Sequence, residues 1–195
     1  IKKDTFIAHG GGLINNDVYT NSLEALDKNY KLGTKYFELD LKLTSDNIIV
    51  AVHDWPSWKK RTNYEGSLPP SHKKFMSYKI DNRYSPLSEF EVKKWFLKRV
   101  DANLITDKLD NFEIIYNAFF EFRKRLIVEL FTNKSIEKAL LIKDSKILIS
   151  ERILWQNRFS EKYLDILSQG KIRPYGFAVH NNKVYENPSF FQKAK

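Results

Sequence analysis

The sequence predicts an α/β fold, a TIM-barrel-like parallel βα barrel that is small or incomplete. Apolar runs of strand length alternate with amphipathic segments of helix length along the chain. The runs are nearly continuous in apolar residues, which is typical of parallel strands buried on both faces. Seven such strands are visible in 195 residues, whereas a closed eight-stranded barrel usually needs at least about 200 residues. An open, doubly wound sheet is the alternative.

The seven expected strands are each rich in Ile, Leu, Val or Phe and are bounded by polar or turn-forming residues. They cover residues 5–9, 35–43, 47–54, 102–107, 125–131, 146–150 and 173–179. After residue 179 no further strand-like run follows, so we expect either an incomplete barrel or a longer chain that supplies strand eight. Unpaired sheet edges would otherwise remain.

Helices are expected between the strands because a start signal precedes each amphipathic segment. Asn21 starts the first, with Glu24 at the capping-box position and Gly33 as its stop. Ser88 and Glu91 form a second capping box. Three more helices are expected at residues 110–122, 135–142 and 160–170, starting at Asp110, Ser135 and Ser160.

One long segment, residues 55–86, interrupts this alternation. It contains four prolines and two tryptophans and reads as irregular structure. Irregular segments of this length are usually functional or disordered, and this one directly follows an expected strand. Sites in parallel βα folds lie at the carboxyl ends of the strands. We therefore expect a single domain over residues 1–195, with 55–86 as a lid-like insertion.

The composition limits the classes of function. The formal net charge is +9, which suits an anionic substrate, although scattered lysines fit a compositional bias equally well. No nucleic-acid-binding motif is visible, so no nucleic acid partner is expected. The absence of cysteine excludes disulfide and thiolate chemistry. No apolar run approaches the roughly 18 residues of a membrane span. No signal peptide is visible, which favours a cytoplasmic location.

Side chains suited to phosphate chemistry lie at the ends of consecutive expected strands. His9 ends the first, Glu38 and Asp40 share one face of the second, His53 ends the third and Asp107 the fourth. Carboxylates on one face suit a hard divalent cation such as Mg²⁺ or Ca²⁺. Two histidines beside that ion suit general acid–base catalysis, and the combination is suited to phosphodiester cleavage. Packing roles for the histidines are the alternative.

The same stretch resembles the glycerophosphodiester phosphodiesterase family, part of a wider group of phosphatidylinositol-phospholipase-C-like barrels. Five elements occur in the family's order: His9, "NSLEA" at 21–25, "ELD" at 38–40, "TSD" at 44–46 and "HD" at 53–54. Further along, "LITD" at 104–107 is similar to branches that carry Asp as a third metal ligand. The motifs therefore cover about the first 54 residues and one later strand.

The resemblance implies that His9 and His53 are the catalytic pair and that Glu38, Asp40 and Asp107 hold one divalent cation, Mg²⁺ or Ca²⁺. It implies a metal-dependent phosphodiesterase of bacterial lipid metabolism that acts on a glycerophosphodiester or a related small phosphodiester. A deacylated phospholipid or a glycerol-phosphate glycan unit is such a substrate. A phospholipase-D-like lyase that forms a cyclic phosphate and a non-catalytic phospho-ligand-binding barrel are the alternatives.

Two positions depart from the family's pattern. Common members carry Arg directly after the first histidine, where Gly10 stands here, and Lys two positions after the third ligand, where Leu109 stands. Lys108 is expected to point to the opposite face of its strand. Gly10 and Gly11 are expected to let backbone amides approach an anion in place of that arginine. A tight turn without a binding role is the other interpretation.

Three further side chains are expected near the substrate. Lys42 shares the face of the second strand with the carboxylates and reaches either phosphate or solvent. Trp55 follows "HD" and either lines the cleft or packs against other aromatic residues. Glu129 ends the fifth strand, where it either replaces Asp107 as a ligand or pairs with Arg152.

Overall fold

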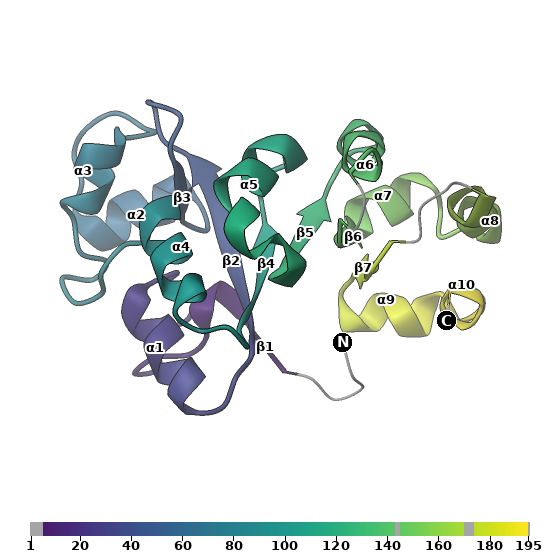
Figure 1. Ribbon diagram of the computed structural model, residues 1–195, viewed down its shortest axis with the longest axis horizontal. Coiled ribbons are helices and arrows are strands. Elements are labelled where there is room, and N and C mark those ends of the chain that lie inside the picture. The colour runs from purple at the N-terminus through teal and green to yellow at the C-terminus, as the bar shows by residue number, and fades with distance from the viewer. Residues whose placement is uncertain (1–5, 143–144, 170–173, 195) are drawn as a thin grey trace. The chain divides into compact units, whose positions relative to one another are not determined.

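The computed structural model describes residues 6–142, 145–169 and 174–194. The chain separates into two compact units, Ile1–Leu109 with Asn117–Leu126 and Asp110–Tyr116 with Ile127–Lys195. In Figure 1 the first unit runs from purple to teal and the second is mainly green to yellow. Among the described residues, no helix is both long enough and apolar enough to cross a membrane. The expectation of a single domain over 1–195 stays a prediction.

The first unit is built on three parallel strands, β1 (Ile7–Ala8), β2 (Tyr36–Leu43) and β4 (Asn103–Asp107). Strand β2 lies between the other two and pairs with each in parallel. The β2–β4 register places Asp40 opposite Asp107, and both are the last polar residues of their buried stretch. The predicted parallel arrangement is therefore confirmed for these strands, and it brings the two aspartates together.

The third predicted strand differs from the expectation. Strand β3 (Ile49–Ala51) pairs antiparallel with β2 and returns along it as a hairpin. Only residues 44–48 connect the two strands, with Asn47 at φ 60° in the turn. A parallel crossover needs a dozen or more residues, so this connection permits only a hairpin. The hairpin ends with the Val52 amide donating to the Asp40 carbonyl, directly before His53.

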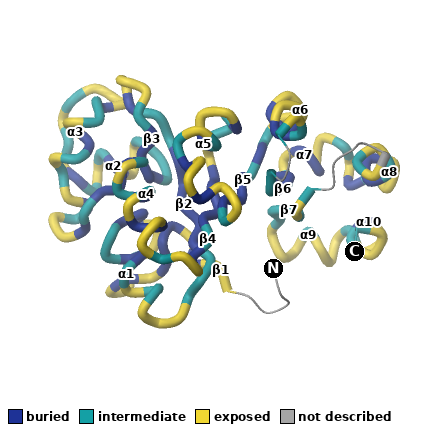
Figure 2. The backbone as a smooth tube through the Cα atoms, viewed as in Figure 1, coloured by how far each residue is buried: buried dark blue, intermediate teal, exposed yellow. Residues whose placement is uncertain are grey.

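The helices of the first unit are α1 (Leu23–Lys31), α2 (Trp55–Thr62), α3 (His72–Met76) and α4 (Glu89–Leu97). A 3₁₀ turn, η1 (His9–Gly11), follows β1, and η2 (Phe120–Arg125) completes the unit. The strands β2 and β4 are largely dark blue in Figure 2 because their central residues are buried, whereas the helices carry exposed outer faces.

One of the two predicted capping boxes is confirmed and the other is wrong. Ser88 and Glu91 cap α4 reciprocally. At α1 the N-cap is Ser22, which accepts from the Ala25 amide, whereas Asn21 lies outside the helix at φ 47°. Glu24 instead accepts hydrogen bonds from the backbone and hydroxyl of Ser85. The helix is therefore capped one residue later than predicted. The Asn21 side chain forms hydrogen bonds with Asp40 instead of capping the helix.

The segment 55–86 is folded and only partly helical, so the predicted irregular structure is corrected for α2 and α3 and holds for the residues between and after them. The side chains of Trp58, Phe75, Ile80 and Tyr84 are buried. They pack with Val50 and Val52 of the hairpin and with residues near α1 in one apolar cluster. Pro56 stands in the first turn of α2, where proline is tolerated, and the other three prolines lie outside both helices. The lid role stays a prediction.

The second unit repeats the parallel pattern with β5 (Leu126–Leu130), β6 (Ile147–Ser150) and β7 (Gly176–Ala178). Strand β6 pairs in parallel with both others. The accompanying helices are α5 (Phe112–Ala118), α6 (Asn133–Leu140), α7 (Glu151–Gln156), α8 (Glu161–Gln169), α9 (Asn181–Glu186) and α10 (Pro188–Lys193). Within the described ranges there are therefore seven strands, six of them parallel, and no eighth.

Two predicted helix starts in the second unit are corrected, and a third boundary lies outside the described residues. Helix α5 is capped by Asn111, whose side chain accepts from the Ile114 amide. The Asp110 carboxylate accepts from the Phe131 amide and the Thr132 hydroxyl instead. Thr132 is also the N-cap of α6, which therefore begins before Ser135. Gly170, the predicted stop of α8, is not among the described residues.

Candidate metal and acid–base site

Four predicted site residues of the first unit converge at the ends of β1, β2 and β4. His9, Glu38, Asp40 and Asp107 each offer one ligand atom, and these atoms all lie within 4.8 Å of one another. The three carboxylates are buried, with exposed fractions of 6%, 0% and 9%. Parallel pairing produces this cluster, because the strands present their carboxyl ends at one edge. The grouping expected from strand position is thus present in the structure.

The hydrogen bonds of the cluster use one oxygen of each β2 carboxylate. Glu38 Oε2 accepts from the Gly10 amide at 2.6 Å and lies 3.3 Å from His9 Nε2. Asp40 Oδ2 accepts from Asn21 Nδ2 at 2.8 Å. The remaining oxygens, Glu38 Oε1 and Asp40 Oδ1, are buried without a hydrogen-bond partner among the described residues. Such atoms are costly to bury, and hard oxygens left open in one cluster fit a divalent cation.

Burial and repulsion perturb the cluster in the absence of a cation. Burial, followed by the charge of Asp40, raises the pKa of Glu38 to about 9, against the opposing hydrogen bond from the Gly10 amide. Glu38 therefore holds a proton at neutral pH when no cation is bound. A divalent cation at the same place favours the charged carboxylate and displaces that proton.

Lys108 reaches into the cluster, so the expectation that it points to the opposite face is wrong. Its Nζ lies 2.7 Å from Asp107 Oδ2 and 3.8 Å from Asp40 Oδ1. The residue has φ 69°, so the chain leaves the strand conformation immediately after Asp107 and the alternation of faces no longer applies. Burial acts to lower the pKa of Lys108, but the hydrogen bond and charge of Asp107 outweigh it and raise that pKa.

Asn21 orients Asp40 and was not recognised from the sequence as a site residue. Its side-chain amide donates to Asp40 Oδ2 at 2.8 Å, and its side-chain oxygen accepts from the Asp40 amide at 3.0 Å. This pair of hydrogen bonds fixes the carboxylate with Oδ1 left open. In the structure Asn21 has a left-handed backbone directly before the Ser22 cap, and its residue type alone did not separate this role from that of a helix cap.

His53 is oriented by its neighbour Asp54. His53 Nδ1 lies 2.8 Å from Asp54 Oδ2, and Asp54 also accepts from the amide and hydroxyl of Ser57. Burial acts to raise the pKa of Asp54, but the hydrogen bonds from Ser57 and His53 outweigh it and lower that pKa to about 2. An ionised Asp54 only accepts, so Nδ1 carries the proton and Nε2 faces away as the free nitrogen.

The glycines after His9 have a packing reason in this structure. Gly10 has φ 58°, and a Cβ built on it would lie 2.7 Å from the Tyr19 Cα. Its amide donates to the carboxyl oxygen Glu38 Oε2. Gly11 is also left-handed, at φ 82°, and faces Ala25 of α1. A phosphate contact by these amides stays a prediction beside this tight turn.

The other residues predicted to contact substrate lie on three different elements. Trp55 begins α2 and packs edge-on against Trp58 and Phe75, which is the aromatic packing given above as its alternative. Lys42 is half-buried on β2, two residues beyond Asp40. Glu129 lies on β5 of the second unit, whereas the carboxylate cluster is built by the first unit alone.

A cavity of about 440 Å³ opens beside His53. Its lining includes Tyr19, Thr20, Val52, Trp58 and Arg61 besides the His53–Asp54 pair. The apolar walls come from the hairpin and from the folded segment 55–86, so the segment contributes to the surroundings of His53. Among these residues Trp58 and Arg61 were missed by the sequence analysis, which considered Trp55 instead.

The sequence matches the family model described as Glycerophosphoryl diester phosphodiesterase family over residues 11–195. The chain belongs to this family. As a member of the glycerophosphoryl diester phosphodiesterases it is a phosphoric diester hydrolase. A search of the curated proteins finds no match.

Solved structures of glycerophosphoryl diester phosphodiesterases share the fold. One from Parabacteroides distasonis has a TM-score of 0.71 at 15% identity, covering 99% of this chain and 71% of that one. A putative enzyme from Agrobacterium tumefaciens has a TM-score of 0.68 at 15% identity, covering 94% and 80%. A phosphodiesterase from Oleispira antarctica, solved with the product sn-glycerol-3-phosphate, has a TM-score of 0.56 at 16% identity, covering 96% and 88%.

These likenesses confirm the predicted fold class. The glycerophosphodiester phosphodiesterase chain has the βα architecture of a TIM-like barrel, and it is incomplete because the described residues provide only six parallel strands. The resemblance first noted in residues 6–54 is confirmed by a family match that extends to residue 195.

Proposed function

We propose that this phosphodiesterase cleaves small glycerophosphodiesters with one divalent cation, Mg²⁺ or Ca²⁺, held by Glu38, Asp40 and Asp107. The single observation that carries the proposal is the pair of buried carboxylate oxygens, Glu38 Oε1 and Asp40 Oδ1, that accept no hydrogen bond from the described residues, in a cluster that also contains Asp107. The set consists of hard oxygen ligands, which favour Mg²⁺ or Ca²⁺ over softer metals.

When bound, such a cation supplies positive charge next to the phosphoryl oxygens and stabilises the charge that develops in the transition state. Within the protein, Asn21 keeps Asp40 in one orientation and Lys108 adds a fixed positive charge beside Asp107. These contacts arrange the ligand oxygens in advance, so little reorganisation is needed when substrate arrives. A phosphate group bound beside the carboxylate cluster would also be attracted by the positive charge of the Lys108 ammonium.

His53 is proposed as one member of the acid–base pair. The Asp54 carboxylate holds its Nδ1 proton, so Nε2 is the nitrogen that accepts or donates a proton. Asp54 stays ionised across the working pH range because its pKa is lowered to about 2. His53 is also at the mouth of the cavity described above, where the alcohol of a phosphodiester has room.

His9 is proposed as the second member. Its side chain is 55% exposed and its Nε2 lies 3.3 Å from Glu38 Oε2. That closeness also makes His9 a potential fourth ligand. The two roles are separable, because a ligand contributes to cation affinity whereas an acid or base contributes to turnover alone. His9→Ala should therefore lower turnover about a hundredfold, typical of a lost acid or base, and leave cation affinity nearly unchanged.

The proposed function is tested with a panel of glycerophosphodiesters that differ in their alcohol, with added Mg²⁺ or Ca²⁺ and products followed by phosphorus NMR. Hydrolysis gives a phosphomonoester signal, whereas a lyase gives a cyclic phosphate, and a binding protein without activity leaves the substrate unchanged. We expect the phosphomonoester. A cyclic product or unchanged substrate across the panel would contradict the proposal.

A further inference from the structure

One aromatic side chain lies between the two proposed catalytic histidines. The centroid of the Tyr19 ring is 4.9 Å from that of His9, with the planes at 80°, and 5.3 Å from that of His53, with the planes at 53°. Tyr19 also lines both the cavity beside His53 and a second cavity beside His9. The contact with His9 is edge-to-face, which is an attractive arrangement, and the contact with His53 is tilted, so one ring contacts both imidazoles.

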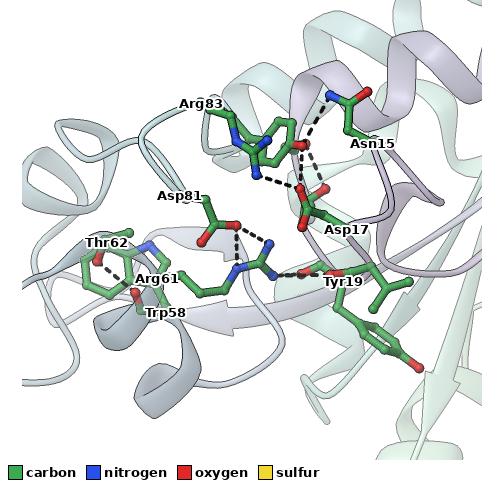
Figure 3. A network of polar contacts seen from close by, with 12 residues as sticks. Asn15, Asp17, Tyr19, Trp58, Arg61, Thr62, Asp81 and Arg83 are labelled. Carbon is green, nitrogen blue, oxygen red and sulfur yellow. Dashed lines mark hydrogen bonds and ion pairs between the residues drawn. The ribbon is translucent and has the colours of Figure 1, made fainter.

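The backbone that carries this ring is held by a pair of charged residues. Arg61 Nη1 donates to the carbonyl oxygens of Val18 and Tyr19, each at 3.2 Å. Asp81 in turn accepts from Arg61 Nε at 3.0 Å and from Nη2 at 2.6 Å. Figure 3 shows this chain of contacts and the Tyr19 ring directed away from the guanidinium. The backbone of Tyr19 is thereby fixed from the side of the folded segment 55–86.

The conformation that Arg61 holds is one that a tyrosine rarely adopts. Tyr19 has φ 53°, in the left-handed region that disfavours large side chains. On its other side the missing Cβ of Gly10 leaves room for the Tyr19 Cα, and the Asn21 amide donates to the Gly10 carbonyl at 2.9 Å. An uncommon conformation that is held from both sides indicates that the placement of the ring is selected.

We propose that Tyr19 is a positioning residue for the acid–base pair and that Arg61 and Asp81 act through it. The inference rests on the proposed function of His9 and His53. Both imidazoles are about half exposed, with side-chain exposures of 55% and 42%, so hydrogen bonds on one side alone leave each ring free to tilt. A shared ring restricts both, and correct orientation of catalytic groups contributes to rate. Among the described residues the Tyr19 hydroxyl has no hydrogen-bond partner, so the role belongs to the ring.

The test uses the variants Tyr19→Leu, Tyr19→Phe, Arg61→Met and Asp81→Asn and, as a control, Arg83→Met. Arg83 lies in the same segment and binds the Asp17 carboxylate at 2.9 Å, without a contact to Tyr19. Tyr19→Leu should lower kcat about tenfold and change KM less than about threefold, because orientation rather than binding is lost. Tyr19→Phe should keep the kcat of the parent protein. Arg61→Met should lower kcat by a smaller factor than Tyr19→Leu, and Arg83→Met should leave kcat unchanged.

A spectroscopic readout separates positioning from general structural damage. Ring currents from Tyr19 act on the carbon-bound protons of His9 and His53, so their NMR shifts at fixed pH should move in Tyr19→Leu and Arg61→Met. They should stay close to the parent positions in Tyr19→Phe and Arg83→Met. If Tyr19→Leu does not fold, Arg61→Met and Asp81→Asn carry the test, since the ring remains present in both.

Unchanged kcat in folded Tyr19→Leu, or unchanged kcat and histidine shifts in both Arg61→Met and Asp81→Asn, would overturn the proposal. An equal loss in Tyr19→Phe and Tyr19→Leu would also overturn it, because the hydroxyl would then act directly. Failure of the proposed function gives a different result: no hydrolysis by the unaltered protein, with the ring-current shifts still as expected.

Discussion

The acidic side chains of the two units differ in how they are neutralised. In the first unit Glu38, Asp40 and Asp107 are buried together and leave two oxygens unpartnered. In the second unit, acids such as Glu113 and Asp165 lie on helix surfaces and pair with lysines at 2.8 Å and 2.9 Å. Exposed pairs contribute little to stability, whereas grouped buried carboxylates are costly without a cation. Three carboxylates buried together, with one lysine beside them, therefore mark the first unit as the site.

The histidines repeat the contrast. His53 and His180 each place Nδ1 near a carboxylate, at 2.8 Å from Asp54 and 3.1 Å from Glu151. His53 borders the cavity of about 440 Å³ described above, whereas His180 is 85% exposed at the start of α9. A histidine–carboxylate pair is therefore proposed to be catalytic in the first unit and not in the second. The pair in the second unit serves as the control for the pair in the first.

The largest expected effect comes from a cluster carboxylate. Asp40→Asn should lower phosphodiesterase turnover about a thousandfold, roughly 4 kcal/mol, because the proposed cation loses a ligand. The matched change Glu113→Gln removes an exposed acid paired with Lys138 and should leave turnover within about twofold of the parent. Steady-state rates measured on folded variants check both. Similar rates for the two variants would remove the contrast between the units.

The histidine comparison is the next in size. His53→Ala should lower turnover about a hundredfold, the typical contribution of a positioned acid or base. His180→Ala removes the other histidine of a histidine–carboxylate pair and should have no measurable effect on turnover. Circular dichroism controls for folding. A comparable loss from both, or from neither, would show that proximity to the cluster is not what makes His53 important.

The raised pKa of Glu38 predicts how stability depends on pH in the metal-free protein. Between about pH 5 and its folded pKa of about 9, the folded state keeps a proton that the unfolded state has lost. Stability contributed by this group is therefore present at low pH and falls as pH rises, by up to about 1.4 kcal/mol per pH unit. Denaturant unfolding in EDTA should show this slope in the parent and in Glu113→Gln, but not in Glu38→Gln.

The smallest expected effect concerns Lys108. Its ammonium contacts Asp107 and lies near Asp40, so it competes with a cation for the same negative charge. Lys108→Met should raise Mg²⁺ affinity roughly fivefold, about 1 kcal/mol, while Lys138→Met should not change it. Titration calorimetry compares the two. Weaker binding in Lys108→Met would show that Lys108 supports the cation site instead of opposing it.

Local patterns predicted much of this architecture, and the exceptions have physical causes. Period-two alternation placed Glu38 and Asp40 on one face, and parallel pairing joined them with Asp107. The hairpin at β3 was missed because an apolar run does not specify strand direction, whereas the short connection at 44–48 does. Lys108 was misplaced because a left-handed residue after a strand reverses the expected face, and nothing in the sequence marks it as left-handed.

The roles of Asn21 and Tyr19 could not be predicted from the spacing of residues along the sequence. Asn21 fits a cap by residue type, but its side chain binds Asp40, which is 19 residues away. Tyr19 is separated from His9 and His53 by loops and helices, so no periodicity relates the three rings. The contacts of the Tyr19 ring depend on the Tyr19 backbone, which Arg61 holds by a hydrogen bond and for which Gly10 leaves room because it has no Cβ. These contacts therefore become visible only in three dimensions.

The central claim, that the buried carboxylates hold a divalent cation, is tested most directly by calorimetric titration of metal-free protein with Mg²⁺ and with Ca²⁺ at pH 7. Repeating it in buffers of different ionisation enthalpy counts the protons released. The account predicts one site per chain and release of about one proton, from Glu38. Binding should be lost in Asp40→Asn and kept in Glu113→Gln. No binding of either cation, or equal binding by both variants, would contradict it.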